Sequence, residues 1–140
     1  MVKQKLVLVA DDSADDFLVI QKGCSKAGLP HKLVHIADGQ AVLAYLESAR
    51  APGNAEHPPF PDLLILDAKM PGTNGFEVLA FLREHPTLQV PVVMLSGSIL
   101  RKDKEKALAL GASDYFSKPF ELAELRELVQ TIQDRWLAEP

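Results

Sequence analysis

The chain has 140 residues, of which 47% are hydrophobic and 24% charged, which is typical of a globular protein rather than a disordered chain. A formal net charge of −4 gives no case for binding nucleic acid or an anionic membrane, and no apolar stretch reaches the ~20 residues that a membrane-spanning helix needs. The single cysteine, Cys24, excludes an internal disulfide. The lack of an internal disulfide and an N-terminus unlike a signal peptide both favour a location in the cytoplasm. We expect residues 1–140 to form one domain.

Five short apolar runs alternate with helical patterns along the chain. The runs are rich in Val, Ile and Leu, as in parallel strands that are covered on both faces. Apolar residues recur at helical spacing between the runs and again after the last of them. Such a series of βα units predicts an α/β fold, a doubly wound five-stranded parallel sheet. The predicted strands are Leu6–Ala10, Leu33–Ala37, Leu63–Leu66, Val90–Leu95 and Tyr115–Phe116.

Local signals set the ends of the first helix and identify one long loop. Ser13 is placed to cap the helix that follows the first strand, and Gly28 to end it. Cys24 lies on the apolar face of this helix, so we expect a core residue rather than a reactive thiol. The segment Arg50–Pro61 holds four prolines and one glycine, which predicts an exposed loop within the domain.

Polar side chains follow four of the predicted strands at their carboxyl ends. They are Asp11 and Asp12 after the first strand, Asp67 after the third, Ser96 after the fourth and Lys118 after the fifth. Ligands of parallel α/β sheets bind beyond these strand ends, so the side chains are expected to converge. Neighbouring carboxylates repel one another, and three of them beside a lysine suit Mg²⁺ or Mn²⁺. An Asp beside a cation, a lysine and a hydroxyl can accept a phosphoryl group.

The motifs around these residues give the chain a resemblance to a known family. In chain order they are VADDS, LILDAKMPGTNGFEVL, VVMLSGS and GASDYFSKPF. With them, the chain resembles the receiver domain of two-component response regulators from about Lys5 to the last helix. The resemblance implies the flavodoxin-like (βα)5 receiver fold. It also implies a phosphorylation-dependent signalling switch, not an enzyme with a separate substrate, that catalyses its own Mg²⁺-dependent phosphorylation and dephosphorylation.

The resemblance implies that Asp67 is the phosphoacceptor. It also implies that Mg²⁺ (or Mn²⁺) is bound directly by Asp12, by Asp67 and by the backbone carbonyl of Lys69, while Asp11 acts mainly through a bound water. The Lys69 side chain lies two residues after the acceptor, at a position that tunes dephosphorylation in this family. It is therefore expected to affect the lifetime of the phosphoryl group.

The same resemblance implies roles for residues of the last two strands. Ser96 would hydrogen-bond the phosphoryl group, and Lys118 would pair with another of its oxygens. Tyr115 matches the aromatic switch residue, whose ring turns inward when the hydroxyl moves. Lys118–Pro119 matches the family's cis peptide bond.

The implied partners are proteins. A sensor histidine kinase or a phosphotransfer protein would donate the phosphoryl group, and a downstream protein would receive the signal, without nucleic acid or membrane. The surface of the fourth helix, fifth strand and fifth helix is the expected output surface, and a homodimer through it is allowed. The proline-rich loop and the segment DDSADD resemble stand-alone regulators that serve bacterial phytochromes.

Three alternatives stay open at the level of the sequence. A metal-dependent phosphatase of the haloacid-dehalogenase type has a second acid two residues after its Asp nucleophile, whereas here Ser13 and Ala14 lie two residues beyond the paired acids. A nucleotide- or flavin-binding module needs a glycine-rich turn after the first strand, where this chain has ADDSADD. A degenerate receiver that never takes a phosphoryl group is disfavoured because all five site residues are present.

Overall fold

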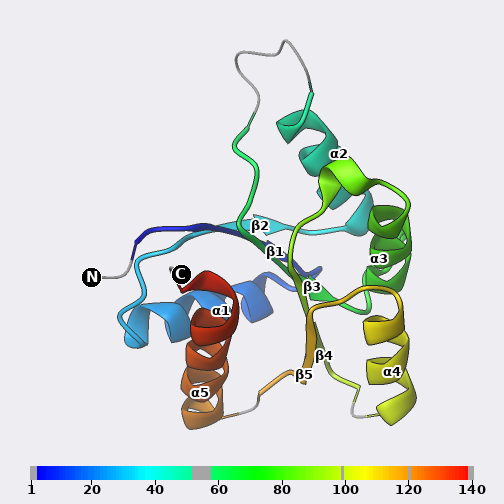
Figure 1. The fold of residues 1–140 in the computed structure, drawn as a ribbon. Coiled ribbons are helices and arrows are strands. Elements are labelled where there is room, and N and C mark those ends of the chain that lie inside the picture. Colours follow the sequence, from blue (N-terminus) through cyan, green and yellow to red (C-terminus); the bar gives the residue numbers. More distant parts are fainter. Residues whose placement is uncertain (1–2, 52–57, 99, 120, 139–140) are drawn as a thin grey trace.

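The strands form one parallel five-stranded sheet in the order β2-β1-β3-β4-β5. The computed structural model describes residues 3–51, 58–98, 100–119 and 121–138. Because the chain order reverses direction across the sheet after β2, the predicted doubly wound sheet is confirmed (Figure 1). The strands are β1 (Leu6–Ala10), β2 (Lys32–Ile36), β3 (Leu63–Asp67), β4 (Val92–Ser96) and β5 (Asp114–Ser117).

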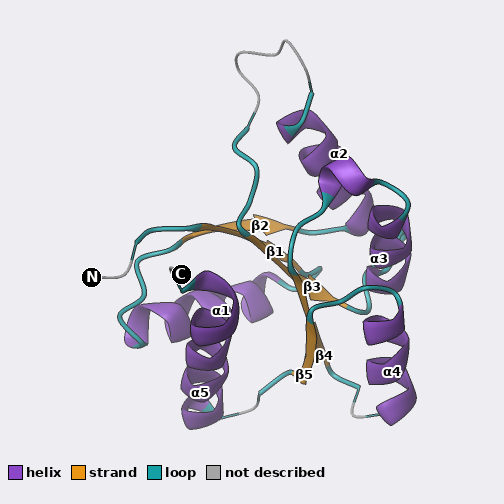
Figure 2. Cartoon of the chain, in the orientation of Figure 1, coloured by secondary structure: helices purple, strands orange, loops and turns teal. Residues whose placement is uncertain are grey.

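Helices cover both faces of this sheet. As Figure 2 shows, α1 and α5 lie on one face, and α2, α3 and α4 on the other. A 3₁₀ turn at Pro86–Leu88 precedes β4, and a π-helical turn at Gln133–Leu137 continues α5. The helices are α1 (Ala14–Lys26), α2 (Gly39–Ala49), α3 (Gly75–Arg83), α4 (Arg101–Ala109) and α5 (Leu122–Ile132).

The strand ends differ from the predicted ones by at most two residues. β4 begins at Val92 rather than Val90, because Pro91 has no N–H to donate to a neighbouring strand. β5 is longer than predicted, because Asp114 and Ser117 also pair with β4. The predicted loop Arg50–Pro61 does follow α2, but its residues 52–57 lie outside the described residues.

The strands separate two apolar cores by their alternation. In β1, Leu8 and Ala10 face the core beneath α2, α3 and α4, whereas Val7 and Val9 face the core beneath α1 and α5. All five residues of β3 are buried, and β3 lies between β1 and β4. Asp67, the last residue of β3, is therefore held at the buried centre of the sheet edge.

The two predicted signals at the ends of α1 are confirmed. The Ser13 hydroxyl accepts the backbone N–H of Asp16 at 3.2 Å, so the helix begins directly after the paired acids. Gly28 follows the helix with a φ of 73°, a conformation that glycine adopts without steric cost. Cys24 packs against the core beneath α1, and burial raises the pKa of its thiol to about 11. This thiol is thus unreactive at neutral pH, as predicted.

The helices are held with different strength. α1 and α5 pack closely. A Cβ added at Gly23 of α1 would lie 2.7 Å from the Leu125 side chain of α5, which shows how near the two helices are. α4, by contrast, buries one residue, Ala107, and Leu100, which precedes the helix, provides no side-chain cap. Figure 1 shows α4 at the rim of its layer, beside α3.

Gly75, the first residue of α3, is predicted to be sensitive to substitution. An added Cβ would overlap the Asp67 carbonyl oxygen and approach the Ala68 Cα at 2.9 Å. Gly75→Ala is therefore expected to lower the free energy of unfolding by about 2 kcal/mol, measured by urea denaturation. Gly97→Ala is the control, because no atom lies within 4 Å of its added Cβ. Equal loss of stability in both variants would contradict the steric explanation.

Candidate functional site

Three predicted acids converge at the carboxyl edge of the sheet. β1 and β3 are neighbours, and Ala10 pairs with Leu66, so Asp11 and Asp67 follow paired residues. One carboxylate oxygen from each of Asp11, Asp12 and Asp67 lies within 4.8 Å of the others. Asp11 and Asp67 are buried, and Asp12 is exposed. The cluster is compatible with a divalent cation, because it offers hard oxygen ligands with one solvent-facing side.

Lys118 joins this cluster from the end of β5. Its Nζ donates hydrogen bonds to Asp11 Oδ2 at 3.0 Å and to Asp67 Oδ2 at 3.1 Å. The side chains of Asp11 and Asp67 are only 3% and 7% exposed, so the ammonium compensates two nearly buried carboxylates. The predicted convergence of Asp11, Asp67 and Lys118 is therefore present in the structure.

A fourth acid, Asp16, contacts Lys118 and was missed by the sequence analysis. Asp16 Oδ2 accepts a hydrogen bond from Lys118 Nζ at 2.7 Å, the shortest of the three. No helical spacing signals this contact, because Asp12 lies before α1 and Asp16 lies inside it.

Backbone N–H groups fix the orientation of both buried carboxylates. The second oxygen of Asp11, Oδ1, accepts the Ser13 N–H at 2.9 Å. The second oxygen of Asp67, also Oδ1, accepts the Lys69 N–H at 3.3 Å. Each carboxylate thus has one oxygen toward the backbone and one toward Lys118.

Charge and burial shift the pKa values of the central pair. Burial raises the pKa of Asp67, and the nearby Asp11 adds to this shift, although hydrogen bonding to Lys118 opposes it. For Lys118, burial alone would lower the pKa, but the hydrogen bonds to Asp16, Asp11 and Asp67 outweigh it and hold the pKa well above its ordinary value. Lys118 is therefore a permanent cation, whereas the Asp67 carboxylate is destabilised by its surroundings.

Ser96 and Tyr115 are connected through Ser98. Ser96 is fully buried at the end of β4, and its Oγ accepts the Ser98 N–H at 3.1 Å. The Tyr115 hydroxyl donates to the Ser98 carbonyl at 3.1 Å, and the Ser98 hydroxyl donates to Asp103 of α4 at 2.5 Å. These hydrogen bonds link the strand end to the first turn of α4. Ser98 is the residue of this link to which sequence reasoning gave no role in the switch.

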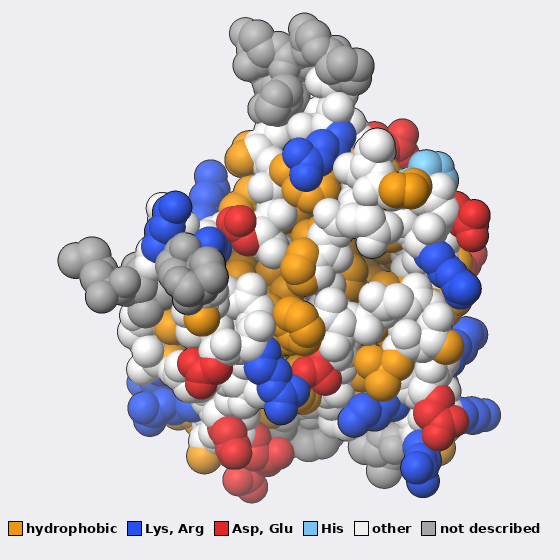
Figure 3. Space-filling model, in the orientation of Figure 1, with side chains coloured by type: hydrophobic (Ala, Val, Ile, Leu, Met, Phe, Trp, Pro, Cys, Tyr) orange, Lys and Arg blue, Asp and Glu red, His pale blue; other side chains and the backbone are white. Residues whose placement is uncertain are grey.

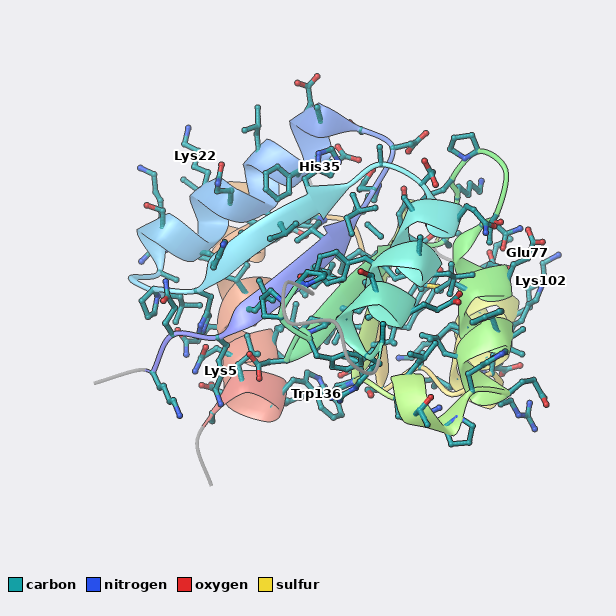
Figure 4. The ribbon with its side chains drawn as sticks, turned by 90° about the horizontal axis from the view of Figure 1, so that it is seen from above. Lys5, Lys22, His35, Glu77, Lys102 and Trp136 are labelled. Carbon is teal, nitrogen blue, oxygen red and sulfur yellow. The ribbon has the colours of Figure 1, made fainter. Side chains whose placement is uncertain are left out.

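One histidine contacts the site without resembling a metal ligand. His35 of β2 lies beside α1 in Figure 4, and its Nε2 donates to the Asp11 backbone carbonyl at 2.7 Å. Its ring stacks on Phe17 of α1, with the ring centroids 4.7 Å apart. Among the described residues, the acidic cluster is the only group with metal-ligand geometry, so no histidine belongs to such a group.

The expected cis peptide bond at Lys118–Pro119 is wrong for this structure. Residues 118 and 119 are both described, and no cis bond occurs in the described part of the chain. The trans form is the lower-energy isomer of an X–Pro bond by about 0.5–1 kcal/mol.

Strand order, buried acids and a lysine that follows the last strand are typical of a receiver domain. Residues 7–130 match the family model of the response regulator receiver domain, and the chain belongs to this family. Over 134 residues it is 33% identical to the response regulator Rcp1 of Synechocystis sp., covering 95% of this chain and 89% of Rcp1.

Solved structures agree with this assignment. The phosphorylated cyanobacterial phytochrome response regulator RcpA is 34% identical, with a TM-score of 0.81 over 96% of this chain and 95% of RcpA. The Mn²⁺-bound form of Rcp1 is 33% identical, with a TM-score of 0.80 over 95% of this chain and 94% of Rcp1. The predicted flavodoxin-like receiver fold and phosphorylation-dependent signalling function are confirmed, and the phosphatase alternative finds no support. No helix in the described ranges has the length and apolarity to span a membrane.

Proposed function

We propose that residues 1–140 form a single receiver domain in which Asp67 accepts a phosphoryl group from a sensor histidine kinase or a phosphotransfer protein. The observation that carries the proposal is the buried Asp67 carboxylate, 3.1 Å from Lys118 Nζ and within the acidic cluster. An Asp67 oxygen attacks phosphorus, the bond from phosphorus to the donor's histidine nitrogen breaks, and an acyl phosphate forms. Water later hydrolyses the acyl phosphate to the carboxylate and inorganic phosphate. The domain catalyses both steps on itself.

The proposed cation is Mg²⁺, with Mn²⁺ as a substitute. Asp12, Asp67 and the Lys69 carbonyl are the proposed direct ligands, and Asp11 is the proposed ligand through water. When bound, the cation neutralises charge that develops on the phosphoryl oxygens. Lys118 supplies a second positive charge, and the Ser96 hydroxyl supplies a hydrogen bond to another oxygen.

Phosphorylation is proposed to change the surface of α4, β5 and α5. The hydrogen bonds among Ser96, Ser98 and Tyr115 support this route, because a Ser96 hydroxyl that turns toward a phosphoryl oxygen leaves the Ser98 N–H. The link from Ser98 to Asp103 then carries the change to α4. The phosphoryl group thus shifts the population by binding one arrangement better than the other.

The output partner is proposed to be a protein with acidic and apolar side chains, or a second copy of the chain. Figure 3 shows Lys and Arg side chains gathered around α4. Leu100 and Leu108 are large hydrophobic residues exposed beside them. The exposed basic residues of α4 are Arg101, Lys102, Lys104 and Lys106.

The input is proposed to come from a phytochrome-type sensor kinase in the cytoplasm. The likeness to RcpA supports this proposal, as does a TM-score of 0.83 and 27% identity to the response regulator RPA3017 in red light signaling of R. palustris. Neither partner would be a nucleic acid or a membrane.

The proposal is tested by intact-mass measurement after incubation with acetyl phosphate, with and without Mg²⁺. One added phosphoryl group that depends on the metal is the expected result. If no mass is added, binding of beryllofluoride with Mg²⁺ distinguishes rapid hydrolysis from an inactive site. A protein that neither gains a phosphoryl group nor binds beryllofluoride would contradict the proposed function.

Metal binding is expected to depend on the exposed member of the cluster. Asp12→Asn replaces an anionic ligand with a neutral one, so the affinity for Mg²⁺ should fall at least about tenfold, measured by isothermal titration calorimetry. Asp15→Asn is the matched control, because Asp15 is an exposed acid in the first turn of α1 outside the cluster. An equal effect of both substitutions would indicate general charge attraction instead of ligation.

A further inference from the structure

We propose that Asp16 is a positioning residue that keeps Lys118 at the site when the phosphoryl group and the cation occupy the lysine's other partners. The inference rests on the proposed function, in which Lys118 pairs with a phosphoryl oxygen. No metal ligand role is assigned to Asp16, because it lies outside the acidic cluster.

The first argument is the set of acceptors around the ammonium. A lysine ammonium has three N–H donors, and Lys118 Nζ contacts three carboxylate oxygens at 2.7, 3.0 and 3.1 Å. The two longer contacts are to Asp11 and Asp67, which belong to the cluster that fits a cation. The shortest contact is to Asp16, whose carboxylate lies outside the cluster that fits a cation.

The second argument is the exchange of partners on phosphorylation. The Asp67 carboxylate becomes an acyl phosphate, so its negative charge moves to the phosphoryl oxygens. Asp11, the proposed ligand through water, would be engaged by the cation. Asp16 is then the remaining carboxylate partner of Lys118, and one N–H stays bonded while another is redirected to the phosphoryl group. Without this bond, a flexible four-carbon side chain loses its fixed position.

The third argument is the location of Asp16. Its backbone N–H is bonded to Ser13 Oγ, so the carboxylate is presented from the capped first turn of α1. The Asp16 side chain is 42% exposed, and this leaves it accessible when the buried acids are occupied. Asp11, Asp16 and Lys118 also line a common cavity of about 40 Å³.

The inference is tested by the rate of phosphorylation with acetyl phosphate at saturating Mg²⁺. Asp16→Asn is expected to slow labelling about tenfold, because the reacting geometry is loosened. In a Lys118→Ala background the same substitution should change the rate by less than about twofold, since the residue it positions is gone. Asp15→Asn is the control for the loss of one negative charge, and its rate should equal that of the wild type.

A conservative variant and a stability measurement complete the test. Asp16→Glu keeps a carboxylate and should recover most of the lost rate, a result that does not require the Lys118→Ala variant to fold. Urea denaturation of the Asp16 and Lys118 single and double variants, without metal or phosphodonor, should show that the two effects on stability are not additive.

Two results would overturn the inference. One is an unchanged labelling rate in Asp16→Asn, and the other is an equal slowing of labelling in the presence and absence of Lys118. A wild-type protein that takes neither a phosphoryl group nor beryllofluoride would instead contradict the proposed function, and the inference would fail with it. The stability measurement distinguishes failure of the inference from failure of the proposed function, because it reports the Asp16–Lys118 ion pair without any phosphodonor.

Discussion

Asp67→Asn is expected to take up no phosphoryl group from acetyl phosphate in the presence of Mg²⁺. The amide lacks the anionic oxygen that attacks phosphorus, while the shape of the side chain is almost unchanged. Intact-mass measurement of wild type and variant under the same conditions checks the prediction. A phosphoryl group on the variant would show that the acceptor is another residue.

The same substitution is expected to leave the protein at least as stable at pH 7. Burial raises the pKa of Asp67 above its ordinary value of 3.8. A raised pKa in the folded state means that this group's contribution to stability is present below the ordinary value and is lost as the pH rises through the folded value. Asparagine cannot ionise, so this loss disappears. A lower urea midpoint for Asp67→Asn at pH 7, without metal, would contradict the assigned effect of burial.

Lys118→Ala is expected to have the second largest effect, on both stability and labelling. Removing the ammonium leaves the nearly buried carboxylates of Asp11 and Asp67 without their common donor. Breaking such a buried contact costs about 3 kcal/mol, measured by urea denaturation. Labelling by acetyl phosphate should continue but slow about a hundredfold, as for the loss of one donor to a transition-state oxygen.

Added Mg²⁺ provides the control for this variant. Since the cation can replace part of the missing positive charge, it should raise the melting temperature of Lys118→Ala more than that of the wild type. An unchanged rate of labelling, or a phosphorylated variant with the same active arrangement as the wild type, would refute the role given to Lys118.

The sheet could be predicted from the sequence because parallel strands covered on both faces are apolar throughout. The run before Asp11 and the run before Asp67 end at polar residues, and this placed the carboxyl edge correctly. The exact start of β4 was not predictable from hydrophobicity, since Val90 is as apolar as Val92. The start of β4 is set by Pro91, which has no N–H with which to pair with a neighbouring strand.

The site was predictable in part, for a physical reason. Residues at strand ends are brought together by the parallel topology, so Asp11, Asp67 and Lys118 could be placed from their positions alone. Asp16 lies inside a helix, and its contact depends on the direction of the lysine side chain. The direction of the lysine side chain follows from packing and hydrogen bonding in the folded protein, and the sequence does not indicate it.

The weak attachment of α4 bears on the free energy that the proposed change of this surface would require. Moving a two-state equilibrium from 1:99 to 99:1 takes about 5.5 kcal/mol. Hydrogen bonds to a charged group contribute about 1.5–3 kcal/mol each, so a few new bonds to a phosphoryl group are sufficient. Displacing a helix that buries only Ala107 adds little to this cost, whereas separating α1 from α5 would add much more. The fold is therefore tightly packed between α1 and α5 and loosely packed at α4, the helix of the proposed output surface.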